Sequence, residues 1–321
     1  MNEKNPWDGI PNAGSRSSFS ARKVSRGHNP RGIPAYWAVD LNGRIALLVE
    51  YFLETWYPAR LPEFENIELR DSEEDKSIAL VLLDSQMQDM FLGICLDVIS
   101  YLQDLPDAQR REGMLLRLER WNLLLKPTRR EMSEEQQKGL VAELLFLKDD
   151  VMPTMDEASA LEAWSGPLRD ARDFSFGDAF VEVKSKRNAS TPRISISSEN
   201  QLSTNPSEKL FLYVLDIDRA PLGKGFTVTD IAHETRSMIE SPLQKSIFDN
   251  KLASVGYFEE DDYSGTRWIE GASYYYTVLE GFPRIDSKSC NPGVSRVAYQ
   301  IDLNYCDDYQ VDRATVIETM E

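Results

Sequence analysis

Residues 172–185 have the sequence RDFSFGDAFVEVKS, in which polar and apolar side chains alternate on both sides of residues 177–178. Alternation on both sides of a Gly-Asp pair is typical of a tight β-hairpin. In such a hairpin each residue faces the one at the same distance beyond the turn, so Asp173 is predicted to lie directly opposite Glu182. Opposed side chains share one face of the sheet, with their β-carbons about 5 Å apart.

The Asp173–Glu182 pair predicts a cation site. Two carboxylates this close repel each other, so the pair lowers stability unless a cation compensates it. Mg²⁺ prefers oxygen ligands, commonly one or two carboxylates with waters and substrate phosphate oxygens, and Mn²⁺ accepts similar ligands. Lys184 lies on the same face as Glu182, because strand side chains alternate with a period of two. There it could orient or help deprotonate an attacking water, or stabilise charge growing on a phosphate.

A helix is predicted before the hairpin. Residues 133–136, Ser-Glu-Glu-Gln, form a capping-box pattern that starts a helix running to about residue 150. Glu143 is the one acid within the apolar run LVAELLFL of residues 140–147. A buried carboxylate is unfavourable unless it is paired or metal-bound. Glu143 is therefore either a site residue that faces the hairpin or a boundary residue of an amphipathic helix.

Composition excludes several other kinds of site. The 321 residues carry a net charge of -17, so any nucleic-acid site must be local or completed by a partner. The two histidines, His28 and His233, leave little room for a multi-histidine zinc site or for a histidine-based catalytic triad. Cys95, Cys290 and Cys306 match neither a disulfide framework nor a CxxC metal site. No run approaches the roughly 20 apolar residues of a membrane span and no signal-peptide pattern is present, so a cytoplasmic location is expected.

The chain is predicted to divide into a basic flexible arm (1–34), an N-terminal α+β domain (35–127), a second domain (128–255) and an acidic, β-rich C-terminal extension (256–321). The arm is rich in Gly, Ser and Pro and carries the basic residues Lys4, Arg16, Arg22, Lys23, Arg26 and Arg31. It is either a solvated tail or an arm that binds nucleic acid. The N-terminal domain shows no chemical motif and is expected to be a packing or partner-recruiting module.

Strands and helices are expected from the periodicity of the apolar residues. In the N-terminal domain we expect strands at 36–40, 44–50 and 78–83, an Asn-Gly turn at 42–43, and helices at 85–104 and 107–126. Beyond the helix at 133–150, helices are expected at 156–164, from residue 199, at 228–240 and at 242–253. Besides the hairpin, strands are expected at 193–198, 210–215, 273–279 and 294–302.

The spacing of Asp173, eight intervening residues and Glu182-Val183-Lys184 resembles the D-x(n)-E-x-K signature of the PD-(D/E)XK nuclease superfamily. Taken alone, a Glu-x-Lys on a strand is also common as a solvated charge pair. The expected order of helix, hairpin, strand, short helix and strand is similar to the superfamily core. The resemblance implies an α/β fold whose restriction-endonuclease-like core has a mixed central sheet flanked by helices. It also implies catalytic roles for Asp173, Glu182 and Lys184, and a Glu143 that contacts the metal directly or through water.

Residues beside the hairpin are candidates for contacts with the substrate. Gln201 resembles the polar residue that some superfamily members place near the phosphate, with helix capping or a surface position as alternatives. Lys186, Arg187 and Arg193 form a local basic cluster that could meet backbone phosphates or be a solvated face. Arg172 stands where many members have a proline, but that proline is not universal in the superfamily.

The layout, with an α+β region before the GLVAEL helix and the RDF hairpin, resembles the bacterial PD-(D/E)XK motif protein family, which tends to occur with restriction or phage-defence genes. This resemblance implies a Mg²⁺-dependent DNA endonuclease of a restriction-like or phage-defence system, with DNA and further proteins as partners. Two alternatives stay open. The protein is otherwise a non-catalytic scaffold or DNA-positioning subunit of such a system, or an acidic inhibitor that mimics DNA.

Overall fold

The computed structural model describes residues 5–14, 17–53, 57–126, 131–168, 170–188, 191–221, 223–286, 290–291 and 293–320. The chain forms two compact units, one of residues 1–129 and 241–250 and the other of residues 130–240 and 251–321. The boundary expected at 126–128 lies largely outside the described residues, and the segment limits drawn from the sequence stay predictions. Within the described ranges, none of the helices is long and apolar enough to cross a membrane.

The first unit contains an antiparallel sheet of strand order β1-β2-β3-β5-β4. Its strands are β1 (Phe19–Lys23), β2 (Ala35–Asp40), β3 (Ile45–Glu50), β4 (Ile67–Ser72) and β5 (Ser77–Leu82). The three expected strands are thus confirmed as β2, β3 and β5, with small changes at their ends. The expected Asn-Gly turn is also present, because Gly43 has a φ of 77°, the left-handed conformation that this hairpin loop requires.

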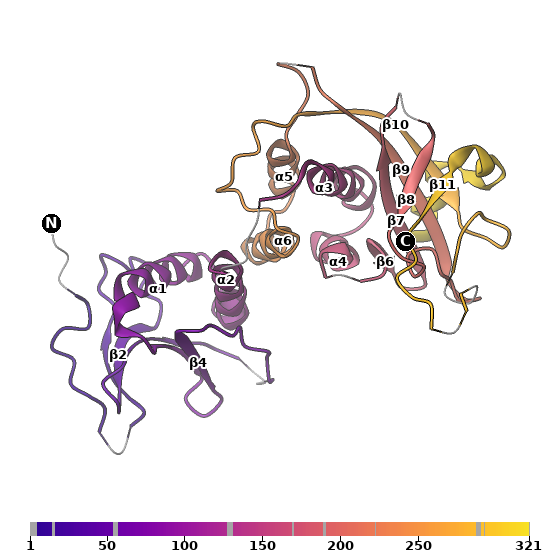
Figure 1. Cartoon of the computed structure of the whole chain (residues 1–321). Helices are drawn as coiled ribbons and strands as arrows, with labels where there is room; N and C mark the ends of the chain where they lie inside the picture. The colour runs from indigo at the N-terminus through magenta and orange to yellow at the C-terminus, as the bar shows by residue number, and fades with distance from the viewer. Residues whose placement is uncertain are drawn as a thin grey trace. The chain divides into compact units, whose positions relative to one another are not determined.

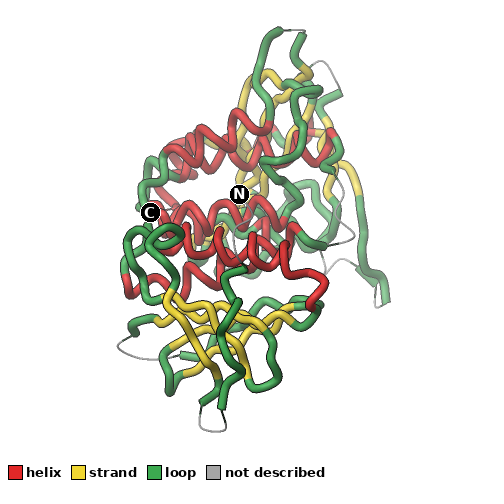
Figure 2. The backbone as a smooth tube through the Cα atoms, turned by 90° about the vertical axis from the view of Figure 1, so that its left-hand side faces the viewer, coloured by secondary structure: helices red, strands yellow, loops and turns green. Residues whose placement is uncertain are grey.

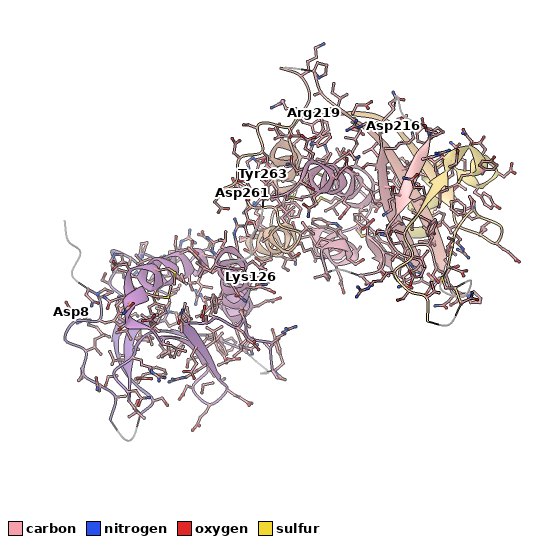
Figure 3. All side chains as sticks on the ribbon, viewed as in Figure 1. Asp8, Lys126, Asp216, Arg219, Asp261 and Tyr263 are labelled. Carbon is pink, nitrogen blue, oxygen red and sulfur yellow. The ribbon has the colours of Figure 1, made fainter. Side chains whose placement is uncertain are left out.

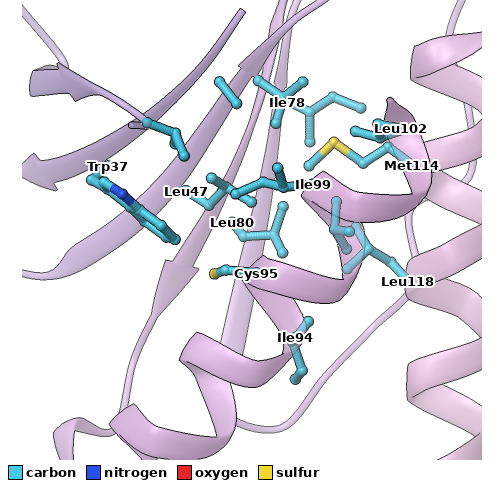
Figure 4. Close-up of a cluster of buried hydrophobic side chains, with 14 of the residues drawn as sticks. Trp37, Leu47, Ile78, Leu80, Ile94, Cys95, Ile99, Leu102, Met114 and Leu118 are labelled. Carbon is cyan, nitrogen blue, oxygen red and sulfur yellow. The ribbon is translucent and has the colours of Figure 1, made fainter. Parts of the chain in front are cut away.

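Helices α1 (Gln88–Leu102) and α2 (Arg110–Leu124) cover one face of this sheet and confirm the two expected helices. Short 3₁₀ turns, Ser85–Met87 and Asp107–Gln109, precede them. In Figure 2 the strands of this unit form one layer and its helices another. The core between the layers is apolar, and Figure 4 shows part of it, labelled at Trp37, Leu47, Ile78, Leu80, Ile94, Cys95, Ile99, Leu102, Met114 and Leu118.

The segment 1–34 differs from the extended arm expected from its composition. Strand β1 pairs with β2 along its whole length. Trp7, Val24 and Ile33 are buried in the core of the unit. A few apolar anchors are enough to pack a segment whose overall composition is polar, and composition alone does not reveal them. Two of the basic residues expected there lie outside the described residues, Lys4 and Arg16.

Gly113 on α2 is required by close packing. A β-carbon at this position would lie 2.1 Å from Leu105 Cδ1 and 3.2 Å from Tyr101 Cε1. We therefore expect Gly113→Ala to lower the free energy of unfolding by about 2 kcal/mol, although alanine favours helices. Gly93→Ala on α1 is the matched control, because a β-carbon there meets no atom within 4 Å, and it should be neutral or stabilising. Urea unfolding measures both, and equal stabilities of the two variants would contradict this account.

The second unit begins with helix α3 (Glu134–Phe146), and its expected capping box is confirmed between Ser133 and Gln136. A π-helical turn, Leu147–Val151, and helix α4 (Glu157–Ala163) follow. The central sheet has the order β12-β10-β9-β7-β6. Its strands are β6 (Phe174–Phe176), β7 (Ala179–Lys186), β9 (Lys209–Arg219), β10 (Trp268–Thr277) and β12 (Gln310–Val311). β7 and β9 run parallel while the other neighbours are antiparallel, so the sheet is mixed.

Different layers cover the two faces of this sheet. Phe146 of α3 packs on Phe174 and Tyr213, with ring centroids 4.9 Å apart in each pair, and α5 (Val228–Ser237) packs on α3. The opposite face carries a two-stranded sheet of β8 (Arg193–Ile196) and β11 (Tyr299–Asp302). Figure 1 shows α3 and this small sheet on opposite sides of the central strands. The expected α/β class with a restriction-endonuclease-like core and a mixed central sheet is confirmed.

Most other elements expected beyond residue 150 are confirmed with shifted ends. The helices at 156–164, 228–240 and 242–253 are α4, α5 and α6 (Pro242–Ser254), and the strands at 210–215 and 273–279 belong to β9 and β10. The strand expected at 294–302 is shorter, because β11 covers its last four residues. The chain ends with helix α7 (Arg313–Met320), which was not expected.

The strand expected at 193–198 is confirmed as β8, which ends at Ile196 and pairs with β11, where Ile194 faces Ile301. One expectation was wrong. The helix expected from Glu199 is a turn. The Glu199 carboxylate accepts the backbone N–H of Val297 at 2.8 Å. A side chain bound to distant backbone in this way favours an irregular turn over a helix start.

Candidate active site

The hairpin has the expected register. Phe174 pairs with Val181, Ser175 with Phe180, and Phe176 with Ala179, around a turn that places Gly177 at a φ of 66°. Asp173 lies one residue before β6 begins, where the register continued by one step would place it opposite Glu182.

Asp173 is held by backbone groups on both sides. Its Oδ2 accepts the N–H of Val183 at 2.8 Å. Its carbonyl oxygen accepts the N–H groups of Ser165 and Gly166, both at 2.9 Å. These bonds fix the carboxylate next to strand β7, on which Glu182 lies.

Glu182 and Lys184 lie on the same face of β7, as the period of two predicts. The Glu182 side chain is fully buried, and its Oε1 accepts a hydrogen bond from Lys184 Nζ. Its other oxygen, Oε2, has no hydrogen-bond partner. The Lys184 side chain is 17% exposed. The pair is therefore a buried ion pair, rather than the solvated pair that was the alternative.

Glu143 projects from α3 toward the same place. Its Oε2 accepts a hydrogen bond from Trp164 Nε1 at 2.8 Å. A β-carbon built on Gly166 would lie 3.0 Å from this oxygen and 3.0 Å from Asp173 Oδ1, so the two carboxylates meet around one point. The structure thus brings Glu143 to the pair, while its role as a metal ligand stays a prediction.

Burial and neighbouring negative charge disfavour the ionised forms of these carboxylates. Burial, followed by the charge of Asp173, raises the pKa of Glu143 to about 8. Burial and then Asp173 also raise the pKa of Glu182 well above its ordinary value, and burial raises that of Asp173. Burial works against the charged form of Lys184, but Glu182 and Asp173 outweigh it and raise the pKa of this ammonium group. The cluster holds more acids than this one lysine compensates, which favours binding of a further cation.

A cavity of about 510 Å³ opens beside these residues. It brings together Glu143, Asp173 and Lys184 with the four residues predicted to contact the substrate, Lys186, Arg187, Arg193 and Gln201. The rest of its lining includes Lys138 and Gly139 of α3, Ser185 and Ser195. The cavity therefore combines residues of helix α3, of the hairpin and of the segment 193–201.

The four residues predicted to contact the substrate differ in their exposure and in their interactions with other side chains. Lys186 is mostly buried and forms an ion pair with Asp216 of β9, labelled in Figure 3, so its charge is already compensated. Arg187 and Arg193 are exposed, and Arg193 lies 3.5 Å from Asp302. Gln201 lines the cavity from a turn, with its Oε1 bound by the N–H of Ser197 at 2.8 Å. The two arginines are thus more exposed than Lys186.

Sequence analysis missed two residues of the site, Trp164 and Gly166. Both lie in the sequence WSGP between α4 and β6, which signals no more than a turn before the structure is known. Trp164 contacts Glu143, and Gly166 adjoins both Glu143 and Asp173. The sequence does not show that the Trp164 indole N–H binds Glu143, because the two residues are 21 positions apart and only the fold brings them together.

The donor set suits a hard divalent cation. Among the described residues, no three Asp, Glu, His or Cys side chains already stand as a metal-ligand group. Mg²⁺ needs fewer protein ligands, because it commonly takes one or two carboxylates and keeps several waters. The unpartnered Oε2 of buried Glu182, close to Asp173, meets that requirement.

A helix that presents a Glu, a hairpin with Asp and Glu-x-Lys, and a neighbouring parallel strand define the PD-(D/E)XK class of nucleases. A family model described as "Putative PD-(D/E)XK family member" (DUF4420) matches residues 3–304. The chain belongs to this family. A search of curated proteins and a search of solved structures found no match. Membership indicates a nuclease, and nucleases of this class typically use divalent metal ions.

Proposed function

We propose that the protein is a Mg²⁺-dependent DNA endonuclease that acts in the cytoplasm as part of a restriction-like or phage-defence system. In this proposal Asp173, Glu182 and Glu143 hold the metal ion, Mn²⁺ can replace Mg²⁺, and Lys184 acts on the phosphate. The observation that carries the proposal is the unpartnered oxygen of buried Glu182 beside two further acids. Buried negative charge of this kind is unfavourable unless a cation compensates it.

Asp173 and Glu182 each have one carboxylate oxygen that is held by a hydrogen bond within the protein. Val183 N–H holds Asp173 Oδ2, and Lys184 holds Glu182 Oε1. The oxygens that remain for a cation are Asp173 Oδ1, which faces Glu143 across Gly166, and Glu182 Oε2. A bound metal ion would supply a Lewis acid for the phosphoryl group and a template for the attacking water.

The chain's own cations complete the proposed site. Lys184 stays protonated beside two carboxylates, so it is suited to stabilise the negative charge that grows on the phosphate. Arg187 and Arg193 are exposed and line the cavity, where they would bind neighbouring phosphates of the DNA backbone. Gln201 is held on the same wall and would position the strand.

A cleavage assay tests this function directly. Modified and unmodified DNA should be cut in the presence of Mg²⁺ or Mn²⁺ and left intact in EDTA, with the proteins encoded beside this chain either added or omitted. DNA binding without cleavage under all these conditions would favour a scaffold and contradict the proposal. Tight binding to another nuclease, reversed by DNA, would identify an acidic mimic and contradict it equally.

The isolated chain is expected to bind DNA weakly and to cleave it slowly at physiological salt. Its net charge of -17 opposes phosphate binding, which depends mainly on Lys and Arg contacts. Proteins encoded beside it should increase both binding and cleavage. Fluorescence anisotropy over a range of salt concentrations measures binding, and a gel assay measures cleavage. Tight, salt-resistant binding with rapid specific cleavage by the chain alone would contradict the need for a partner and leave the nuclease assignment intact.

A further inference from the structure

The segment Trp164–Gly166 connects α4 to strand β6 and contacts two of the proposed metal ligands. Trp164 is fully buried, and its Nε1 donates to Glu143 Oε2 at 2.8 Å. The backbone N–H groups of Ser165 and Gly166 donate to the carbonyl oxygen of Asp173, both at 2.9 Å. One short segment therefore holds Glu143 through a side chain and Asp173 through its backbone.

Gly166 lies where the two carboxylates converge. A β-carbon at this position would lie 3.0 Å from Glu143 Oε2 and 3.0 Å from Asp173 Oδ1, tighter than ordinary van der Waals contact. The φ of Gly166 lies outside the left-handed region, so its backbone conformation does not require glycine. The requirement is space, because any side chain here would push on both acids.

The segment is anchored from helix α6. Lys251, 8% exposed, donates from Nζ to the carbonyl oxygen of Trp164. Ser254 Oγ lies 3.0 Å from the carbonyl oxygen of Pro167 and 2.7 Å from that of Lys251, and it donates its one hydrogen to either of them. Trp164 is thus held at its backbone by Lys251 while its indole holds Glu143. The bond from Lys251 holds the backbone from which the indole projects, and the bond to Glu143 holds the indole itself.

We propose that Trp164 and Gly166 are positioning residues of the metal site. Trp164 orients Glu143, and Gly166 leaves the room in which the Glu143 and Asp173 carboxylates approach one cation. This inference rests on the proposed metal site and adds residues that act through the ligands without touching the substrate. Hydrogen-bond partners of metal ligands typically change metal affinity by about 10-fold to 100-fold when they are lost.

Calorimetric titration of the full chain with Mg²⁺ tests the inference. Trp164→Phe removes the indole N–H and keeps an aromatic ring, and Gly166→Ala adds one methyl group between the carboxylates. Trp164→Phe is expected to bind Mg²⁺ at least about tenfold more weakly than the wild type, and Gly166→Ala is expected to bind it more weakly because the methyl group presses on both carboxylates. Gly93→Ala is the matched control, since its β-carbon meets no atom within 4 Å on α1, and it should bind as the wild type does. Far-UV circular dichroism shows whether each variant is folded. If one of the two is not folded, the Mg²⁺ affinity of the other decides the test.

The NMR resonance of the Trp164 indole N–H gives a second measurement, which would not respond to Mg²⁺ if Trp164 had only a structural role. Its NMR resonance, identified by its loss in Trp164→Phe, should shift when Mg²⁺ is added to the wild type and stay in place in Glu143→Gln. Equal Mg²⁺ affinities in the wild type and both variants, with an unmoved resonance, would overturn the positioning roles and leave the metal site standing. Failure of the wild type to bind Mg²⁺ would overturn the metal site itself and this inference with it.

Discussion

Alanine at position 184 is expected to lower Mg²⁺-dependent DNA cleavage by at least about 100-fold. Lys184 is the cation hydrogen-bonded to Glu182 at the edge of the cavity, so its loss removes the group proposed to stabilise charge on the phosphate. The change also leaves the buried Glu182 without its ion-pair partner. Uncompensated buried charge of this kind lowers the free energy of unfolding by about 3 kcal/mol. Single-turnover cleavage, measured well below the melting temperature of Lys184→Ala, separates lost chemistry from lost folding.

Lys209→Ala is the matched control for this experiment. Lys209 is exposed at the start of β9 and does not line the cavity. Its replacement should change neither cleavage nor stability measurably. Cleavage by Lys184→Ala within a few-fold of the wild type would show that Lys184 has no part in the reaction.

Asp173→Asn is expected to change activity and stability in opposite directions. Asparagine keeps an oxygen that can accept the Val183 N–H, and it removes the charge that raises the pKa values of Glu143 and Glu182. The metal-free variant should therefore be more stable than the wild type by about 1 kcal/mol. Cleavage should fall by about 100-fold or more, because a neutral amide is a poor ligand for Mg²⁺ compared with a carboxylate. Urea unfolding in EDTA and cleavage in Mg²⁺ measure the two effects.

Asp178→Asn in the turn of the same hairpin is the control. Asp178 is exposed, and its replacement should leave cleavage unchanged and alter stability by less than about 0.5 kcal/mol. A destabilised Asp173→Asn protein that still cleaves DNA would mean that Asp173 serves the structure of the hairpin. A gain in stability together with a loss of cleavage in Asp173→Asn would show that repulsion between these carboxylates is kept because the reaction needs them.

Features set by neighbouring residues could be predicted from the sequence. The hairpin register follows from the Gly177-Asp178 turn and the alternation around it, and the start of α3 follows from the capping box at Ser133. Both depend on contacts within about ten residues, so a local pattern is enough to specify them. The face shared by Glu182 and Lys184 follows in the same way from the period of a strand.

Features set by distant residues could not be predicted. The strand β8 was expected, but its pairing partner was not, because Ile194 pairs with Ile301, more than 100 residues later. Lys186 was expected either to meet phosphates or to lie on a solvated face, but it is mostly buried and forms an ion pair with Asp216 of the neighbouring strand. Trp7 lies in a segment with the composition of a solvated arm, yet its indole donates to the Ala46 carbonyl oxygen at 2.8 Å. Nothing local in the sequence specifies any of these partners.

The sequence by itself determined the hairpin, its register, and an Asp, a Glu and a Lys at adjacent positions of one sheet face, because β-strand geometry converts spacing directly into position. The tertiary structure alone decided that Glu143 of α3 joins these residues and that Trp164 and Gly166 hold the acids in place. It also decided that Glu182 is buried with one oxygen unpartnered. These properties depend on packing between segments far apart in the chain, which sets burial, charge compensation and the space around each carboxylate.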